Sequence, residues 1–517
     1  MKKFSLITRY NFDLALFFST LFLVIIGVLF IYSAGSHDES ISFVYKPYFK
    51  QLIFILPGGI LFALLLHVNY LRLSNYWIIF YVISLIFLVL VLVLPSNFPI
   101  ISSKEINGAK SWISIGNWLV FQPSELIKIL FIVILARFLD KDKPIIIKFK
   151  TRFISVLNGN FDIQKIRFLL LIFSLPLPII GFVMLQPDPG TALVYIPITL
   201  FMLLIGGAKI KHILIVIFIG VVSLTSILIP SHYVKESEKY IQKDQIETMI
   251  NEYSVYSYIL QKKDIENLKN TSLYTIDNTS SSAKNLFKSK LTIIKNNFAY
   301  FTLKIALVCF GIMILFYFLF KLIIKLPIIY YFSVVFFVLS FGILSSAVGQ
   351  IVLKPHHTAR ILAICDRNKD LQGINYNQNQ SIIAIGSGGI LGHGLGNGPQ
   401  NRLKFIPERT TDFIFPVIGE EWGFLRGTLL ILILFSIIIY RGLMISYHSK
   451  DHFGTLLATG ITVMLFSHIF INLAMCTGFW PVMGLPLPFL SAGGSSLLTN
   501  LAGVALLLNI SHKRFIH

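Results

Sequence analysis

Long apolar stretches separated by short polar gaps dominate the chain of 517 residues. A helix needs about 20 residues to cross a bilayer, and most of these stretches reach or approach that length. The pattern predicts an all-α polytopic membrane protein with about twelve transmembrane helices and long extracytoplasmic loops. The stretches lie at Leu14–Tyr32, Leu52–Val68, Tyr76–Leu94, Leu126–Leu139, Leu169–Leu185, Ala192–Ile205, Ile213–Ile229, Phe301–Phe320, Ile328–Val348, Phe413–Tyr440, Leu456–Met475 and Leu497–Leu508.

Composition and charge agree with this class of protein. The chain is 55% hydrophobic and only 13% charged, with a mean hydropathy of +0.76, which excludes a soluble globular protein. The formal net charge of +20 could suggest a nucleic-acid partner, but Lys and Arg gather in short gaps between the apolar stretches. Loops of this kind face the cytoplasm and meet anionic lipid. We therefore expect membrane lipid as a partner and no nucleic acid.

The cationic gaps also predict the orientation of the chain. Counting helices from the first apolar stretch places all of these gaps on one side, which must be the cytoplasmic side of the membrane. Both termini are then cytoplasmic. The loops that hold Trp112, Asp188, Asp370 and Pro488 then lie outside.

A polar segment at residues 231–297 interrupts the apolar pattern. It is rich in Lys, Glu, Asn, Ser and Tyr and has no Gly-rich or paired-acid pattern. We therefore expect a solvated, partly helical extracytoplasmic insertion in place of a catalytic domain. It divides the membrane domain into a first part, residues 1–230, and a second part, residues 298–517, which includes an outer loop at 351–412.

The spacing of cysteine and histidine predicts neither a disulfide framework nor a metal site. Cys309, Cys365 and Cys476 are far apart along the chain. His356 and His357 are adjacent in a loop and lack a third ligand nearby, so we expect a polar rim there.

A first polar cluster, residues 108–128, leads into an apolar stretch. Trp112 and Trp118 flank a turn-rich loop, and a Pro-Ser pair then predicts a helix start with Ser124 as its N-cap. Glu125 and Lys128 are three residues apart, so they share one helical face and can pair. Taken alone, a helix-start ion pair with interfacial tryptophans explains these residues at least as well as a functional site does.

Two further clusters predict rigid hairpins between helices. In Gln186–Ala192, Asp188 stands between two prolines, and we interpret it as the cap of a structural turn. Gly478–Ser496 contains several prolines and glycines. At membrane depth, irregular backbone of this kind is tolerated only where it lines a cavity or is buried in protein.

The most informative cluster is Lys354–Trp422, which is Gly-rich and charged in a chain that is otherwise mostly apolar. Polar backbone and charge are costly beside hydrocarbon, so this segment is the main candidate for chemistry. It is not a Walker loop, because no Gly-Lys-Ser/Thr follows its glycines. We interpret Glu420 and Glu421 as helix-start structure. The charged residues of the segment include Arg360, Asp370, Glu408, Asp412, Glu420 and Glu421.

These four clusters, in this order and on this helix pattern, resemble the SEDS family (shape, elongation, division and sporulation proteins, including RodA, FtsW and SpoVE). The resemblance covers nearly the whole chain apart from the insertion at 231–297 and an added helix pair beside it, because the family usually has ten helices. The string PVMGLPLPFLS, Pro481–Ser491, is more similar to the elongation type than to the division type.

The resemblance implies a peptidoglycan glycosyltransferase of the bacterial cytoplasmic (inner) membrane. Members of the family polymerise lipid II on the outer face, joining the 4-hydroxyl of GlcNAc to C1 of MurNAc on another chain and releasing undecaprenyl pyrophosphate. The elongation type serves cell elongation and rod shape. Its implied partners are a class B penicillin-binding protein, which is the transpeptidase, and elongation-complex membrane proteins. The resemblance assigns no cofactor and leaves open whether a divalent cation assists.

The same resemblance carries roles onto individual residues. The key acid of the family falls on Asp370, with Asp366 as its nearest competitor, in an outer loop that is then catalytic. A carboxylate there would take the proton of the attacking sugar hydroxyl. The leaving pyrophosphate needs cations, and Arg360 and Lys128 are the best candidates. The implied substrate-binding residues are Arg360, Lys128, Glu125, Trp112, Gly373, Glu408 and Asp412.

The chain departs from the family pattern at several positions, which affects the expected substrate contacts more than the family assignment. Leu371 follows Asp370 where the family usually has proline. His356 and His357 stand where Tyr and Gln are common. Thr410 replaces a usual His, and Ala492 replaces a common Tyr.

Three alternative functions share part of this pattern. A division-type, FtsW-like member would carry the same motifs. A lipid II flippase or other transporter would also use Pro- and Gly-broken helices, but the charged residues gather on one face and no clear inverted repeat is found. A non-catalytic cell-wall scaffold would tolerate the loss of Asp370.

Overall fold

The computed structural model describes most of the chain outside its middle and its termini. The described residues are 12–36, 46–95, 101–106, 109–115, 119–140, 175–186, 188–210, 213–214, 217–218, 220, 304–312, 314–315, 339–340 and 376–513. The chain divides into two compact units, one formed by Met1–Ile210 with Leu371–His517 and the other by Lys211–Asp370. In the second unit, the Ser340 hydroxyl donates to the Ala306 carbonyl over 3.0 Å. The helices and strands described below all lie in the first unit.

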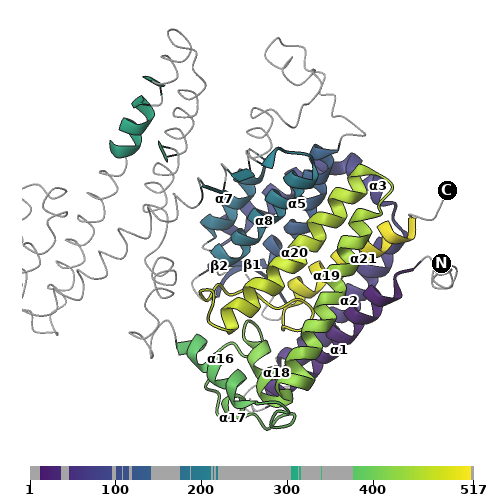
Figure 1. Cartoon of the computed structure of the whole chain (residues 1–517), viewed down its shortest axis with the longest axis vertical. Helices are drawn as coiled ribbons and strands as arrows, with labels where there is room; N and C mark the ends of the chain where they lie inside the picture. Colours follow the sequence, from purple (N-terminus) through teal and green to yellow (C-terminus); the bar gives the residue numbers. More distant parts are fainter. Residues whose placement is uncertain are drawn as a thin grey trace, which may run out of the picture. The chain divides into compact units, whose positions relative to one another are not determined.

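Helices dominate the first unit (Figure 1). Among the described residues, six are long and apolar enough to cross a membrane, which confirms a multi-pass helical protein. They are Leu14–Ser36 (α1), Pro47–His67 (α2), Tyr70–Val93 (α3, Tyr70–Leu73; a 3-10 turn, Ser74–Tyr76; α4, Trp77–Val93), Ile414–Tyr447, His452–Cys476 (α20) and Gly494–Lys513 (α21). Shorter apolar helices are Pro123–Leu139 (α5), Pro176–Leu185 (α7) and Pro189–Ile205 (α8). The number of about twelve spans stays a prediction, because much of the chain between residues 211 and 348 lies outside the described residues.

Several helices extend beyond the apolar stretches that predicted them, because polar residues cap their ends. The helix α20 begins at His452, four residues before the predicted start at Leu456. The carboxylate of Asp451 accepts a hydrogen bond of 2.7 Å from the Gly454 backbone and so satisfies one free N–H of the first turn. Apolar periodicity alone does not detect such an end.

The long apolar stretch Phe413–Tyr440 forms three consecutive segments: α18 (Ile414–Gly423), a π-helical turn (Phe424–Leu429) and α19 (Leu430–Tyr447). The π-helical turn is hydrogen-bonded to the backbone of the Gly-rich segment, because Phe424 N donates to Gly389 O over 2.9 Å. This segment contains the short helices α16 (Tyr376–Ser387) and α17 (Pro399–Arg402), which lie with α18 at one end of the bundle (Figure 1). The Gly-rich segment therefore packs onto protein backbone.

A small antiparallel sheet between α4 and α5 corrects the prediction of an all-α fold. Its strands are β1 (Ile101–Ile106), β2 (Ala109–Ile115) and β3 (Leu119–Phe121), in the order β1-β2-β3. The sequence predicts a turn-rich loop between Trp112 and Trp118, but β2 continues to Ile115. The two residues between β1 and β2 are Asn107 and Gly108, which is a strong sequence signal for a two-residue hairpin.

The helix α20 forms the centre of the unit. It packs against α5, α8, α19 and α21 (Figure 1). In its apolar window 83% of the residues are buried inside the protein, compared with 11% in α2 and 17% in Tyr70–Val93. Polar residues on α20 therefore face protein, whereas α2 and α4 present apolar side chains outward, as lipid-facing helices do.

Substitution of Gly27 tests the close packing of α1 on the Pro-rich hairpin. A Cβ at Gly27 would lie 2.4 Å from the Phe489 carbonyl oxygen, so backbone would have to move. We expect Gly27→Ala to cost about 1–3 kcal/mol and to lower the unfolding temperature in detergent by several degrees. Gly59→Ala in α2, where a Cβ meets nothing within 4 Å, is the matched control and should unfold at or above the wild-type temperature. Equal behaviour of the two variants would contradict this packing.

Candidate functional site

The start of α5 directs several polar side chains into the protein. The chain leaves β3 at Phe121, and Pro123 occupies the first helical turn. The predicted Ser124 N-cap is wrong: Gln122 occupies the cap position in an extended conformation, and Ser124 lies inside the helix. The proline already fixes a helical φ at residue 123, which moves the helix start ahead of the serine.

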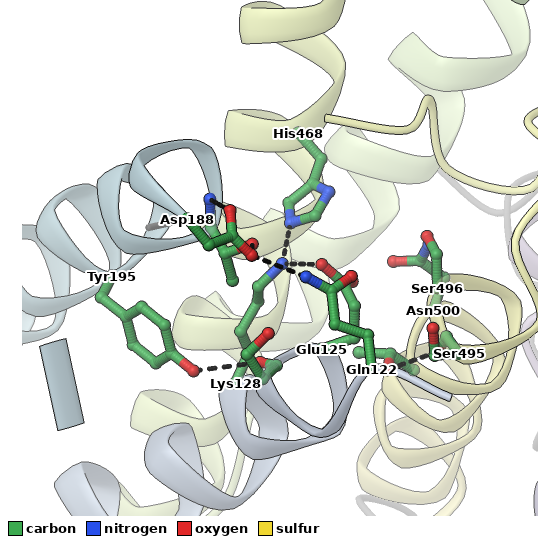
Figure 2. A network of polar contacts seen from close by, with 12 residues as sticks. Gln122, Glu125, Lys128, Asp188, Tyr195, His468, Ser495, Ser496 and Asn500 are labelled. Carbon is green, nitrogen blue, oxygen red and sulfur yellow. Dashed lines mark hydrogen bonds and ion pairs between the residues drawn. The ribbon is translucent and has the colours of Figure 1, made fainter. Parts of the chain in front are cut away.

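A buried ion pair lies one turn further along α5. The ammonium of Lys128 is 2.6 Å from Oε1 of Glu125, so the predicted pairing is confirmed. The side chains of Lys128 and Glu125 are 0% and 2% exposed. Nε2 of His468, from α20, lies 2.8 Å from the same ammonium and is also buried (Figure 2). The ammonium is therefore held between a carboxylate and an imidazole.

Several polar atoms around this ion pair lack a hydrogen-bond partner within the described part of the chain. They are Ser124 Oγ, Glu125 Oε2 and His468 Nδ1. The imidazole Nδ1 faces the backbone of Pro486 without forming a well-aligned hydrogen bond. Buried polar groups are nearly always satisfied, so unpaired atoms around a buried cation mark a place where a polar ligand or water can bind.

Asp188 caps the neighbouring helix α8, as predicted. Its carboxylate accepts from the Thr191 backbone over 3.1 Å and from the Thr191 hydroxyl over 2.6 Å. Gln122 Nε2 donates to it over 2.6 Å, and Tyr195 on α8 donates to the Ser124 carbonyl over 3.1 Å (Figure 2). Burial raises the pKa of the Asp188 carboxyl, although the hydrogen bonds from Thr191 act in the opposite direction. The start of α5 is thereby fixed to the start of α8.

The Pro-rich hairpin, residues 478–493, contacts two other turns of the site. A Cβ at Gly190 would lie 2.3 Å from the Met483 carbonyl oxygen, so the 186–191 turn packs directly on hairpin backbone. Asn472 of α20 donates to the carbonyls of Leu485 and Asp412, over 2.6 and 2.9 Å. The irregular backbone of the hairpin is thus buried in protein, as its sequence predicts.

The acidic turn at residues 407–412 lies against this hairpin. The Ser491 hydroxyl donates to the Thr411 carbonyl over 2.6 Å. Glu408 is exposed, has a positive φ of 53° and accepts from the Thr411 hydroxyl over 3.0 Å. The side chain of Asp412 is half-buried, and its carbonyl is one of the two that Asn472 holds. Glu408 and Asp412 therefore belong to one rigid turn.

One face of α20 carries both parts of the site. His468 and Asn472 are four residues apart, so they lie on the same side of the helix. His468 contacts the ion pair of α5, and Asn472 contacts the hairpin and the acidic turn. The helix therefore links the buried cation to the Pro-rich hairpin and the acidic turn.

The adjacent carboxylates of Glu420 and Glu421 have a structural role that differs from the predicted one. They lie near the end of α18, not at a helix start, and both are fully buried. Glu420 accepts from the backbone of Gln400 and Asn401 at the start of α17, over 2.7 and 3.2 Å. Glu421 accepts from the hydroxyl of Ser33 on α1, over 2.7 Å. The pair fixes the segment around α17 onto the bundle.

The remaining predicted site residues fall into two groups. Trp112 lies in β2, opposite Lys104 of β1, and is half-buried. Arg360, Asp370 and Gly373 lie outside the described residues, as does the competing acid Asp366. Within the described ranges, no group of three His, Cys, Asp or Glu side chains is placed to hold a metal ion.

Sequence reasoning missed His468, Asn472 and Gln122. An ionisable residue inside an apolar stretch is by default a candidate for function, and His468 stands in the middle of Leu456–Met475. This signal was available. Gln122 carried no signal of its own, because its importance depends on Asp188, which is 66 residues away.

The arrangement is suited to binding an anionic, oxygen-rich ligand. A buried ammonium supplies positive charge in surroundings that screen it poorly, so it attracts an anion strongly. Beside it, Ser124 Oγ can donate to a phosphate oxygen, and Glu125 Oε2 can accept from a sugar hydroxyl.

Comparisons with known proteins agree with this fold. The model of the FtsW/RodA/SpoVE family, described as "Cell cycle protein", matches residues 14–258 and 271–515. Peptidoglycan glycosyltransferase RodA of Treponema pallidum is 29% identical over 506 residues, which cover 98% of each chain. A probable peptidoglycan glycosyltransferase FtsW of Trichlorobacter lovleyi is 43% identical over 177 residues, which cover 34% of this chain and 46% of the relative.

A solved structure supports the fold. A chain from the structure titled "Structural coordination of polymerization and crosslinking by a peptidoglycan synthase complex" is similar with a TM-score of 0.58 and 22% identity, over 98% of this chain and 99% of that one. The chain belongs to the FtsW/RodA/SpoVE (SEDS) family and is a peptidoglycan glycosyltransferase of that family.

A double-substitution cycle tests the buried ion pair. Removing one partner leaves an uncompensated buried charge, so we expect Lys128→Met or Glu125→Gln alone to cost about 3–5 kcal/mol of stability. The double variant should be more stable than the sum of the two losses implies, because it removes both charges. Thermal unfolding in detergent measures all three variants. Strictly additive losses would mean that the two charges do not interact.

Proposed function

We propose that this chain polymerises lipid II into glycan strands at the outer face of the bacterial cytoplasmic membrane during cell elongation. The observation that carries the proposal is the buried Lys128 ammonium, held by Glu125 and His468 beside unpaired polar atoms. A cation fixed in advance in a poorly screened site stabilises the negative charge that develops on a leaving pyrophosphate.

The reaction is a single displacement at the anomeric carbon. The GlcNAc 4-hydroxyl oxygen forms a bond to C1 of MurNAc while the bond from C1 to the pyrophosphate oxygen breaks. The hydroxyl proton passes to the carboxylate of Asp370, and undecaprenyl pyrophosphate leaves with the electron pair. Arg360 joins Lys128 in neutralising the leaving group. Glu125, Trp112, Gly373, Glu408 and Asp412 form the surrounding substrate contacts.

The charge pattern supports placing the site at the outer face of the membrane. The cationic gaps predict a cytoplasmic face, so the start of α5, the Asp188 turn and the Pro-rich hairpin belong to the outer face. These turns contact one another in the structure, as parts of a single site on one face would. Lipid-linked substrates can then reach the site while their tails stay in the bilayer, which supplies proximity.

The elongation type is favoured over the division type by the string Pro481–Ser491, which resembles the elongation type. A RodA is among the relatives that match over nearly the full length of the chain. The proposed partners are lipid II, a class B penicillin-binding protein and elongation-complex membrane proteins. The similar chain from a peptidoglycan synthase complex supports the penicillin-binding protein as a partner.

Polymerisation of lipid II by the purified full chain tests the assignment of the base. With its transpeptidase partner present, wild type should form glycan strands, and Asp370→Asn should lose at least about a hundredfold in rate because the amide cannot accept the proton. Asp366→Asn, in the same loop, is the matched control and should retain activity. If Asp366→Asn is inactive and Asp370→Asn is active, the base is Asp366.

Complementation in cells tests the biological role. In a rod-shaped bacterium depleted of its elongation-type enzyme, expression of the chain should restore rods, and the Asp370→Asn variant should not. In cells depleted of the division-type enzyme, filaments should persist. Restored division with unrestored shape would instead identify a division-type enzyme. Restoration by Asp370→Asn would support a scaffold, and flipping of lipid II without polymer in vesicles would support a transporter.

A further inference from the structure

We propose that His468 is a positioning residue that fixes the direction of the Lys128 ammonium and aims it at the leaving group. This inference rests on the proposed function, because it assumes that Lys128 contacts the pyrophosphate. It is carried by three observations: the 2.8 Å contact between His468 Nε2 and Lys128 Nζ, the burial of both side chains, and the position of the ring beside the Pro-rich hairpin.

The hydrogen-bond inventory assigns the protonation state of the imidazole. An ammonium has three N–H donors and no acceptor. His468 Nε2 must therefore accept from Lys128, which places the imidazole proton on Nδ1 and leaves the ring neutral. Nδ1 faces the backbone of Pro486, where a carbonyl is the only polar backbone group because proline has no N–H. One ring thus joins α5 to the hairpin.

A neutral acceptor suits this position better than a charged or apolar residue. Glu125 alone already balances the charge of Lys128. A second carboxylate in place of His468 would surround the ammonium with negative charge and repel an anionic leaving group. An apolar residue would leave the ammonium held by Glu125 alone. The imidazole fixes the direction of the ammonium and adds no charge.

The same contact connects the cation to the outer turns. Asn472, one turn after His468 on α20, holds the Leu485 and Asp412 carbonyls. The hairpin is therefore attached to this helical face at Leu485, and its Pro486 lies beside the His468 ring. Because the hairpin also packs on the turn at Gly190, the ammonium has a fixed position relative to every described turn of the site.

Substitutions that differ only in hydrogen bonding test the proposal. We expect His468→Phe and His468→Leu to lower kcat/KM for lipid II polymerisation about tenfold or more, because the ammonium loses its direction. His468→Gln should stay within about threefold of wild type, since its side-chain carbonyl can accept from Lys128. His448→Phe, at an exposed histidine after α19, is the matched control and should behave as wild type.

A second set of variants separates this inference from the proposed function. If His468 acts through Lys128, adding His468→Phe to Lys128→Met should cause little further loss of polymerisation activity. If the two residues act independently, the fold losses of the two single variants should multiply. Losses that multiply overturn the inference, as does full activity of His468→Phe beside an inactive Lys128→Met. Full activity of Lys128→Met overturns the role of Lys128 in the proposed function itself.

Folding is checked in the same preparations. Unfolding temperatures of the variants in detergent should match between His468→Gln and His468→Phe to within a few degrees. If His468→Phe or His468→Leu fails to fold, the Gln variant decides the outcome through its kinetics. A folded His468→Gln that is as inactive as Lys128→Met would show that ring shape matters and would overturn the hydrogen-bonding role.

Discussion

The requirement that buried charge be compensated determines much of this structure. Lys128 and Glu125 lie within an apolar helix, where an isolated ion would be very costly. Glu125 on the same helix balances the charge of Lys128, and a further hydrogen-bond partner comes from a helix far away in sequence, because His468 lies on α20. To supply that partner, α20 must run through the middle of the bundle, and it does so with most of its apolar window buried. The Pro-rich hairpin and the acidic turn then attach to the same helix through Asn472.

The enzymatic proposal depends on the same compensation. A cation can stabilise a leaving pyrophosphate only if its own protein partners leave it able to contact the substrate. Glu125 uses one carboxylate oxygen for Lys128, and its other oxygen has no partner among the described residues. A site with this incomplete pairing can take up a substrate group. A fully paired one would serve stability alone.

Much of the fold could be predicted from sequence, and the failures have physical reasons. Apolar stretches located the helices, and prolines located the Asp188 turn and the hairpin, because both signals act over a few residues. The small sheet was missed, although the dipeptide Asn107-Gly108 is typical of a two-residue β-hairpin. Ser124 was misassigned as a cap because the preceding proline sets the helix start. The contacts of Glu420 and Glu421 with α17 and α1 depend on tertiary packing, which no local pattern encodes. The roles of Asp370 and Arg360 came from the family resemblance and stay predictions.

The distance along the chain between Lys128 and His468 has a consequence for biosynthesis. The two residues are 340 positions apart. At about 5–20 residues per second, a ribosome adds α20 roughly 20 to 70 s after α5. During that interval Lys128 has only Glu125, which lies on the same helix and is available as soon as α5 forms. The local ion pair therefore compensates the charge of Lys128 in α5 until His468 has been synthesised.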